Sequence, residues 1–246
     1  RPSLLLYFAA CILVVVFKVL EYDSCVLYTK SVIIPLVFIY YLITNEYKIS
    51  LIKSMIFLFC FIGDIFNLLN FDVSSLGALL SFLFVYLLLL KLSYDDFRRF
   101  KFNKSDRLQI LIAFIFIAII STSILSLKFE KMKVDLSMYI IYGITLSLLI
   151  FVSIANYIKR QNYAFLNLVL MCICFMISDV FFVINKFYLS LYAFSFIHIF
   201  VQVFSYFFMV TYFIENDKYL QKQKNNEDIF CKFLLFLAAE PFSFFH

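Results

Sequence analysis

The sequence predicts an all-α protein, a polytopic bundle of about eight transmembrane helices with both termini in the cytoplasm. The first observation is composition, because 65% of the 246 residues are hydrophobic, 15% are charged and the mean hydropathy is +0.98. A soluble domain of this length needs more polar surface to cover itself. The second is that the chain has only three Gly and three Pro, too few to form the many turns that a fold of strands requires. We therefore expect an integral multi-pass protein of a bacterial inner or other cell membrane.

The third observation is that charged clusters divide the chain into apolar runs of the length of a membrane span. About 20 residues at 1.5 Å per residue cross roughly 30 Å of hydrocarbon. The expected spans are residues 3–20, 28–45, 52–70, 73–91, 108–127, 136–158, 162–184 and 188–214. They define an eight-span transmembrane domain over residues 1–214.

Each run has its own justification. The run 3–20 lacks a small-residue cleavage site, so we interpret it as a span and not as a signal peptide. The second and third runs are the least regular, because Lys30, Lys53 and Asp64 interrupt them. Only a short polar turn beginning at Asn70 separates the third run from the fourth, so these two spans are expected to be antiparallel neighbours. The later runs are bounded by charged loops.

The loops also predict the orientation, because cytoplasmic loops carry an excess of Lys and Arg. The loop after the fourth span is the most basic, with Lys91, Arg98, Arg99, Lys101, Lys104 and Arg107. Placing it in the cytoplasm also places both termini there. The net charge of +5 is spread between apolar runs, so it suits anionic lipid and not nucleic acid.

After the last span, residues 215–246 are expected to form a polar cytoplasmic tail with a short apolar end. The stretch 215–228 is rich in charged and amide side chains and is expected to be frayed or disordered. The apolar stretch 229–246 is too short and too interrupted to span, and would lie on the membrane surface.

Several common chemistries are not indicated. Most of the six Cys lie inside apolar runs, without a C-x-x-C pair or an accompanying His cluster, so we expect neither a disulfide, nor a metal site, nor another cofactor. No P-loop, H-E-x-x-H or G-x-S-x-G motif is present.

Two carboxyl groups inside the spans are the most informative residues, because a charge at the bilayer centre costs about 2.5–3.5 kcal/mol on insertion scales. Asp64 lies eight residues before the loop residue Asp72, and Asp179 lies seven before Lys186. At 1.5 Å per residue, both carboxyls lie about 10–12 Å below the same membrane boundary. They are the candidate catalytic residues.

Further polar side chains are expected at a similar depth, and together they predict a convergent polar cavity. The candidate substrate-binding residues are Lys30, Asn67, Ser178 and His198. Asn67 shares a helix face with Asp64, and Gly63 beside that face permits close approach of a neighbouring helix or a ligand.

Each of these residues also has a structural interpretation. A single buried Asp can be a hydrogen-bonded structural residue, and Lys30 can extend to the membrane boundary. His198, Asn67 and Gln202 can be interhelical hydrogen-bonding residues.

The polar stretches resemble the YhhN-like family of lysoplasmalogenases over roughly residues 25–214. The resemblance rests on their order and spacing, namely 30-KSVIIPL-36, 63-GD-64, 76-LGALLSF-82, 177-ISD-179 and 185-NKF-187. The chain departs from the pattern as a divergent member would. Ser31 stands where the family commonly has Pro, Val85 where it commonly has His, and a Cys-rich stretch replaces a Gly-Ala pair before Ser178. The lost His bears on activity and not on fold.

The resemblance implies hydrolysis of the vinyl-ether bond of a lysoplasmalogen, a lysophospholipid, to a fatty aldehyde and a glycerophospho-headgroup. Such a bond breaks by protonation at carbon, so the reaction needs a protonated acid and a group that orients water. Asp64 and Asp179 would divide these roles, in either order. Lys30 would hold the substrate phosphate, and no metal is required. The expected partners are this substrate and membrane lipids, and the oligomeric state is left open.

A non-enzymatic transporter or lipid-binding protein that uses the same carboxyls is the alternative. It predicts gradient-dependent transport and no product from a lysolipid. Against it, only Pro35 and Gly143 interrupt the candidate spans away from the two motifs. A membrane anchor or sensor module is a third interpretation, which the short polar tail disfavours.

Overall fold

The computed structural model describes residues 2–69, 74–98, 104–125, 136–189 and 191–239, and these form eight helices without a strand. The helices are α1 (Pro2–Val19), α2 (Asp23–Thr44), α3 (Leu51–Leu68), α4 (Ser74–Arg98), α5 (Lys104–Leu125), α6 (Leu136–Arg160), α7 (Tyr163–Phe187) and α8 (Tyr192–Ala239). Each contains a window long and apolar enough to cross a membrane. The predicted all-α bundle of eight spans is therefore confirmed.

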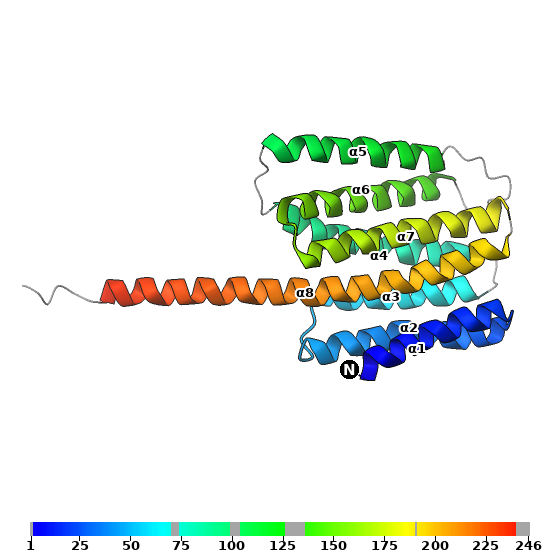
Figure 1. Cartoon of the computed structure of the whole chain (residues 1–246), viewed down its shortest axis with the longest axis horizontal. Coiled ribbons are helices and arrows are strands. Elements are labelled where there is room, and N and C mark those ends of the chain that lie inside the picture. The colour runs from blue at the N-terminus through cyan, green and yellow to red at the C-terminus, as the bar shows by residue number, and fades with distance from the viewer. Residues whose placement is uncertain (1, 70–73, 99–103, 126–135, 190, 240–246) are drawn as a thin grey trace, which may run out of the picture.

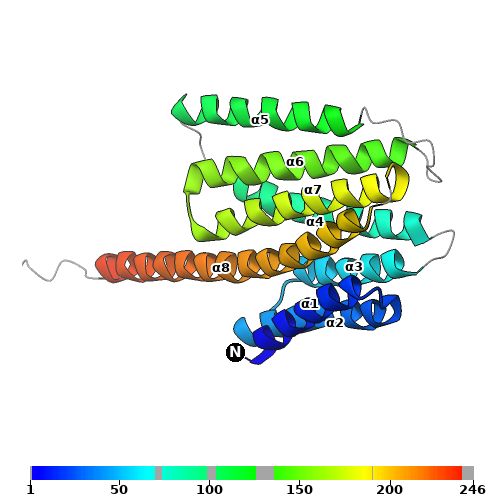
Figure 2. The same ribbon diagram turned by 45° about the vertical axis from the view of Figure 1, so that its right-hand side comes forward.

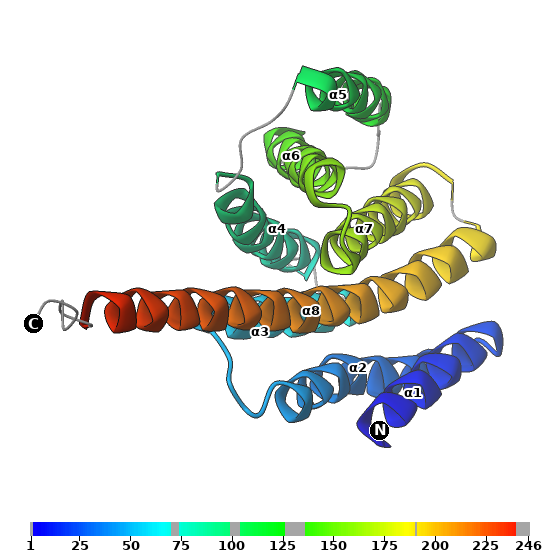
Figure 3. The same ribbon diagram turned by 60° about the vertical axis from the view of Figure 1, so that its left-hand side comes forward.

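The helices form a layered bundle with α5 at one edge and the α1–α2 pair at the other (Figures 1 and 2). The most extensive interfaces join α7 to α8, α1 to α2 and α3 to α4. α6 lies between α4, α5 and α7 (Figure 3). An even number of crossings returns the chain to the side on which it began. The assignment of that side to the cytoplasm stays a prediction from the loop charges.

α3 and α4 pack closely because each has a glycine where the other has a phenylalanine. A Cβ added at Gly63 would lie 2.8 Å from Cε2 of Phe82, and one added at Gly77 would lie 2.9 Å from Cγ of Phe66. Each ring therefore fills the space that the opposite glycine leaves. The room predicted beside Gly63 is occupied by the neighbouring helix. The predicted antiparallel pairing is confirmed, while the connection at 70–73 lies outside the described residues.

The short connections use residues other than glycine in the left-handed backbone region. Glu21, Glu46 and Tyr47 have φ values of 60°, 52° and 59°. All three glycines of the chain lie within helices, so these turns carry a modest backbone strain. The start of α7 is capped in the usual way, since Asn162 Oδ1 accepts a hydrogen bond from the Phe165 backbone N–H at 2.9 Å.

α8 corrects the expectation of a frayed tail, because it runs without interruption to Ala239 and extends beyond the bundle (Figure 1). Residues 215–228 and 229–239 continue this one helix, and residues 240–246 lie outside the described part. A helix already held by the bundle needs no new nucleation, and Lys, Gln and Glu are good helix formers. Lys53 Nζ donates to Asp217 Oδ1 at 2.5 Å and Tyr41 Oη donates to Asp217 Oδ2 at 2.8 Å. These contacts fix α8 against α2 and α3 where it leaves the bundle.

The α3–α4 packing yields a stability test. The substitution Gly77→Leu places a side chain against the Phe66 ring, and overpacking of this kind costs about 1–3 kcal/mol. We expect a lower thermal unfolding midpoint for the purified variant in detergent.

The matched control is Gly143→Leu, because Gly143 lines a cavity, whereas Gly77 faces the Phe66 ring. A Gly77→Leu protein as stable as the wild type and the control would contradict the close packing of α3 on α4.

Candidate functional site

Asp64 on α3 is 1% exposed and lies in a network of polar side chains from α2 and α8, which we call the Asp64 network. Its Oδ1 accepts a hydrogen bond from Gln202 Nε2 at 2.9 Å and lies 3.3 Å from Lys30 Nζ. Its Oδ2 accepts a hydrogen bond from Tyr206 Oη at 2.8 Å. Lys30 Nζ also donates to Gln202 Oε1 at 2.8 Å. Three helices thus meet around one ion pair.

Lys30 is part of this network and does not extend to the membrane boundary, since it is only 2% exposed. A contact between Lys30 and a substrate phosphate would require it to leave both Asp64 and Gln202. Such a contact stays a prediction. The interpretation of Gln202 as an interhelical hydrogen-bonding residue is confirmed, because it joins α8 to both α2 and α3.

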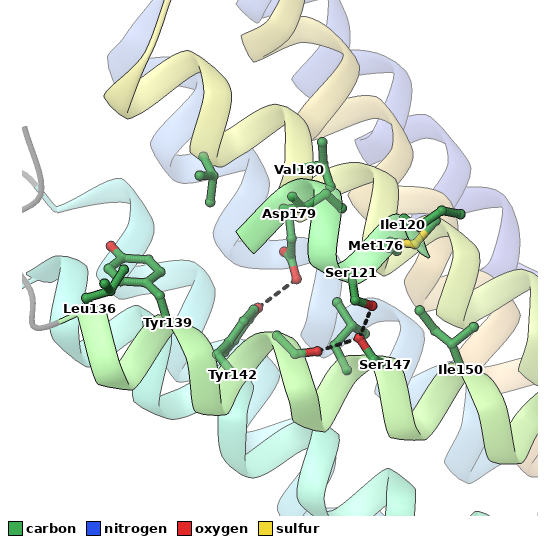
Figure 4. A pocket seen from close by; sticks show the side chains of 14 residues that line it. Ile120, Ser121, Leu136, Tyr139, Tyr142, Ser147, Ile150, Met176, Asp179 and Val180 are labelled. Atoms are coloured by element: carbon green, nitrogen blue, oxygen red, sulfur yellow. Dashed lines mark hydrogen bonds between the residues drawn. The ribbon is translucent and has the colours of Figure 1, made fainter. Parts of the chain in front are cut away.

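Asp179 on α7 has a different environment, which contains two phenols and no cation among the described residues. Tyr86 Oη donates to Asp179 Oδ2 at 2.6 Å, and Tyr142 Oη donates to the same oxygen at 2.7 Å. Figure 4 shows Tyr142 of α6 pointing at the carboxyl. Within the described part of the chain, Oδ1 has no hydrogen-bond partner. A proton carried by Asp179 therefore belongs on Oδ1, because Oδ2 already accepts two hydrogen bonds.

Two cavities adjoin Asp179, and we name each by two of the helices that line it. The α5–α7 cavity has a volume of about 100 Å³ and is lined mainly by apolar side chains of α5, α6 and α7. The α3–α4 cavity has a volume of about 50 Å³ and includes Asn67 and Ser75, near the end of α3 and the start of α4. Both cavities share four lining residues, namely Tyr139, Tyr142, Asp179 and Val183. The Asp179 carboxyl thus lies where the two cavities meet. The α3–α4 cavity has polar side chains near the end of α3, and the α5–α7 cavity is mainly apolar.

The structure does not bring Asp64 and Asp179 together as two walls of one cavity. Asp64 is not among the residues that line either cavity. Phe175 lies between their partners, with its ring centroid 5.4 Å from that of Tyr86 and 6.2 Å from that of Tyr206. The expected single cavity is therefore corrected, because aromatic rings fill the space between two separate polar networks.

The other predicted site residues divide between these surroundings. Asn67 joins Asp179 in the lining of the α3–α4 cavity. Ser178 and His198 instead bind each other across the α7–α8 interface, with 2.9 Å between Ser178 Oγ and His198 Nδ1. Consecutive residues of a helix point about 100° apart, so Ser178 faces α8 while Asp179 faces α6. The interpretation of His198 as a helix-packing hydrogen-bonding residue is confirmed.

Sequence reasoning missed the tyrosines that hold both carboxyls. Tyr86 directly follows Val85, the position where the family resemblance leads one to expect His, and Val85 itself is fully buried. The position of Tyr86 next to Val85 was the one feature of the sequence that could have indicated its role. Tyr142 and Tyr206 carry no such indication, since they are two of 17 Tyr in the chain.

The Asp64 network predicts a characteristic pattern of stability. Lys30→Met leaves the Asp64 carboxylate buried and uncompensated, which costs about 3–5 kcal/mol, whereas removing both charges of a buried pair is close to neutral. We therefore expect Lys30→Met to lower the unfolding midpoint strongly and the double variant Lys30→Met/Asp64→Asn to recover most of the loss. Thermal unfolding in detergent measures both.

The control is Lys218→Met, which breaks an exposed pair with Glu215 at 2.7 Å and is expected to change stability by less than about 1 kcal/mol. A double variant no more stable than Lys30→Met alone would show that the pair does not act as a unit.

Comparison with known proteins agrees with this architecture. The sequence model of the YhhN family matches residues 25–214, which is well over half of the chain. The matched range begins within α2 and ends within α8, so it includes both carboxyl networks. No curated protein and no solved structure matched the chain. The resemblance noted in the sequence is thereby confirmed, and the chain belongs to the YhhN family.

Proposed function

We propose that the protein is a membrane-embedded hydrolase that cleaves the vinyl-ether bond of lysoplasmalogen-type lysophospholipids, with Asp179 as the acid. The observation that supports this most is the placement of Asp179. Its Oδ2 is held by Tyr86 and Tyr142, its Oδ1 has no partner among the described residues, and it lines two cavities. A carboxyl so placed meets an apolar chain on one side and a polar group on the other.

The proposed reaction consumes one water and returns the acid to its starting state. Asp179 Oδ1 donates a proton to the vinyl carbon remote from oxygen, and the carbon–carbon π electrons form the new C–H bond. The ether oxygen then shares the positive charge as an oxocarbenium ion. Two phenol hydrogen bonds to Oδ2 stabilise the carboxylate that remains, and charge-assisted bonds of this type are among the stronger ones.

Water completes the reaction. It adds to the carbon that carries the ether oxygen, and the carboxylate of Asp179 takes the proton that this water releases. The resulting hemiacetal then breaks its bond between that carbon and the glycerol oxygen. Its hydroxyl proton passes to the departing glycerol oxygen, which gives a fatty aldehyde and the glycerophospho-headgroup. No redox step is involved.

The remaining candidate residues have supporting roles in this proposal. Asn67 lies one turn after Asp64 on α3 and lines the α3–α4 cavity, where it is available to the polar part of the substrate. Asp64 and Lys30 hold α2, α3 and α8 in register and do not contact the reacting atoms. Asp179 therefore has a catalytic role in this proposal, and Asp64 has a structural one.

The continuity of the helices favours a hydrolase over a transporter. Transporters of small solutes commonly bind them at broken helices near the membrane midplane. In this chain Pro35 lies inside the continuous helix α2, and the described spans are unbroken.

The proposal predicts that Asp179→Asn releases at least about 100-fold less fatty aldehyde from a vinyl-ether lysolipid, the usual contribution of a general acid. Tyr142→Phe removes one hydrogen bond to the carboxylate and is expected to slow release about 10-fold. The measurement is aldehyde formation by purified protein on a lysolipid panel.

Two controls define the outcome. Asp95→Asn makes the same change at an exposed carboxyl of α4 and is expected to leave the rate unchanged. A saturated alkyl-ether lysolipid, which has no double bond to protonate, is expected to give no aldehyde. Full activity of Asp179→Asn, or no aldehyde from the wild type on any vinyl-ether lysolipid, would refute the proposal.

A further inference from the structure

The α5–α7 cavity continues well past the Asp179 carboxyl. Its lining on α6 runs from Leu136 to Ile150. The part beyond the carboxyl, from Tyr142 to Ile150, covers eight residues or about 12 Å along the helix axis. The two serines on this surface are satisfied within the protein. Ser147 Oγ donates to the Gly143 carbonyl at 2.7 Å, and Ser121 Oγ lies 2.6 Å from Ser147 Oγ, to which it donates. Beyond the carboxyl, the surface that remains for a ligand is therefore apolar.

Gly143 leaves this cavity open. None of the described glycines has a positive φ, so the backbone at Gly143 suits any residue. Glycine inside a helix lowers helix stability relative to alanine, and no turn requires it here. Gly63 and Gly77 face phenylalanine rings, whereas Gly143 lines a cavity. The missing side chain thus provides space beside Tyr142, next to the Asp179 carboxyl.

The contacts between the helices that line the cavity indicate that it opens between α5 and α7. α5 packs on α6 and α6 packs on α7, whereas α5 and α7 have no comparable contact among the described residues. Figure 3 shows α5 beyond α6, away from the rest of the bundle. The other faces of α5 expose large apolar side chains, among them Ile112, Phe116 and Ile119. In a membrane-spanning helix these faces contact lipid, so the opening beside α5 leads into the bilayer.

We propose that the α5–α7 cavity binds the hydrocarbon chain of one lipid molecule, which enters sideways from the bilayer between α5 and α7, and that Gly143 admits the chain. A volume of about 100 Å³ holds only a few methylene groups, so the remainder of a long chain lies in the opening toward the bilayer. The chain then points away from the α3–α4 cavity, as the chain of a lipid points away from its headgroup. The reaction at the reactive end rests on the proposed function, whereas binding of the chain does not.

The test is photolabelling by a lysophospholipid that carries a diazirine in the middle of a long chain, with the full-length protein in phosphatidylcholine nanodiscs. Mass spectrometry locates the label. In the wild type we expect it on residues of α5, α6 and α7 that line the cavity, such as Ile120, Ser147 and Met176. Gly143→Leu is expected to lower this labelling about tenfold, the effect of excluding roughly two methylene groups.

The controls separate blocking of the cavity from loss of the fold. Ile141→Leu changes a neighbouring residue of α6 that is 50% exposed, and labelling is expected to equal that of the wild type. Ile120→Phe narrows the cavity from α5 without touching the α6–α7 interface, and is expected to lower labelling as Gly143→Leu does. Equal labelling in the wild type, Gly143→Leu and Ile120→Phe would overturn the inference, as would label confined to lipid-facing residues outside the cavity.

The same experiment on Asp179→Asn separates the two proposals. Labelling that survives Asp179→Asn but is lost in Gly143→Leu supports the chain site even where no aldehyde is formed. Aldehyde release by the wild type combined with undiminished labelling of Gly143→Leu overturns the chain site and leaves the hydrolase proposal standing.

Discussion

The need to give every buried charge a partner in hydrocarbon governs this structure. Lys30 and Asp64 are 2% and 1% exposed, and they lie 3.3 Å apart with Gln202 bonded to both. A lone charge at that depth would be costly, so α2, α3 and α8 must meet with their polar groups aligned. Lys53 and Asp217 repeat the arrangement nearer the extension of α8. The two ion pairs thus fix the same three helices at two levels.

Asp179 satisfies the same requirement in another way. Its partners are two phenols on one oxygen, the other oxygen has no partner among the described residues, and the side chain lines two cavities. A fixed cation beside a carboxyl favours its charged form, which holds no proton to donate. A carboxyl held by hydroxyl groups remains able to exchange a proton with a bound molecule. Because the two networks differ in this way, we assign the catalytic role to Asp179 and a structural role to Asp64.

The sequence predicted the eight helices well and their lateral arrangement poorly. Span length and hydropathy depend on one dimension, the distance across the bilayer, so the eight helices were accessible from the sequence. Which helix faces which neighbour depends on side-chain packing. Phe175 separates the two carboxyl networks, and no periodicity in the sequence indicates that a phenylalanine occupies that position.

The sequence also did not predict the roles of the tyrosines or the structure of the segment after residue 214. Tyr86 and Tyr142 matter because they reach Asp179 from two different helices, a relation that composition does not reveal in an aromatic-rich chain. The polarity of residues 215–228 suggested disorder, yet α8 continues through them because Asp217 is fixed by Lys53 and Tyr41. Local composition describes what a segment prefers alone, and the bundle supplies the rest.

One comparison of variants tests the division of roles between the two carboxyls. Aldehyde release from a vinyl-ether lysolipid is measured per folded molecule for Asp179→Asn and for the double variant Lys30→Met/Asp64→Asn. We expect Asp179→Asn to be folded and inactive, while the folded double variant still releases aldehyde. A folded, inactive double variant beside an active Asp179→Asn would place the chemistry at Asp64 and contradict this division of roles.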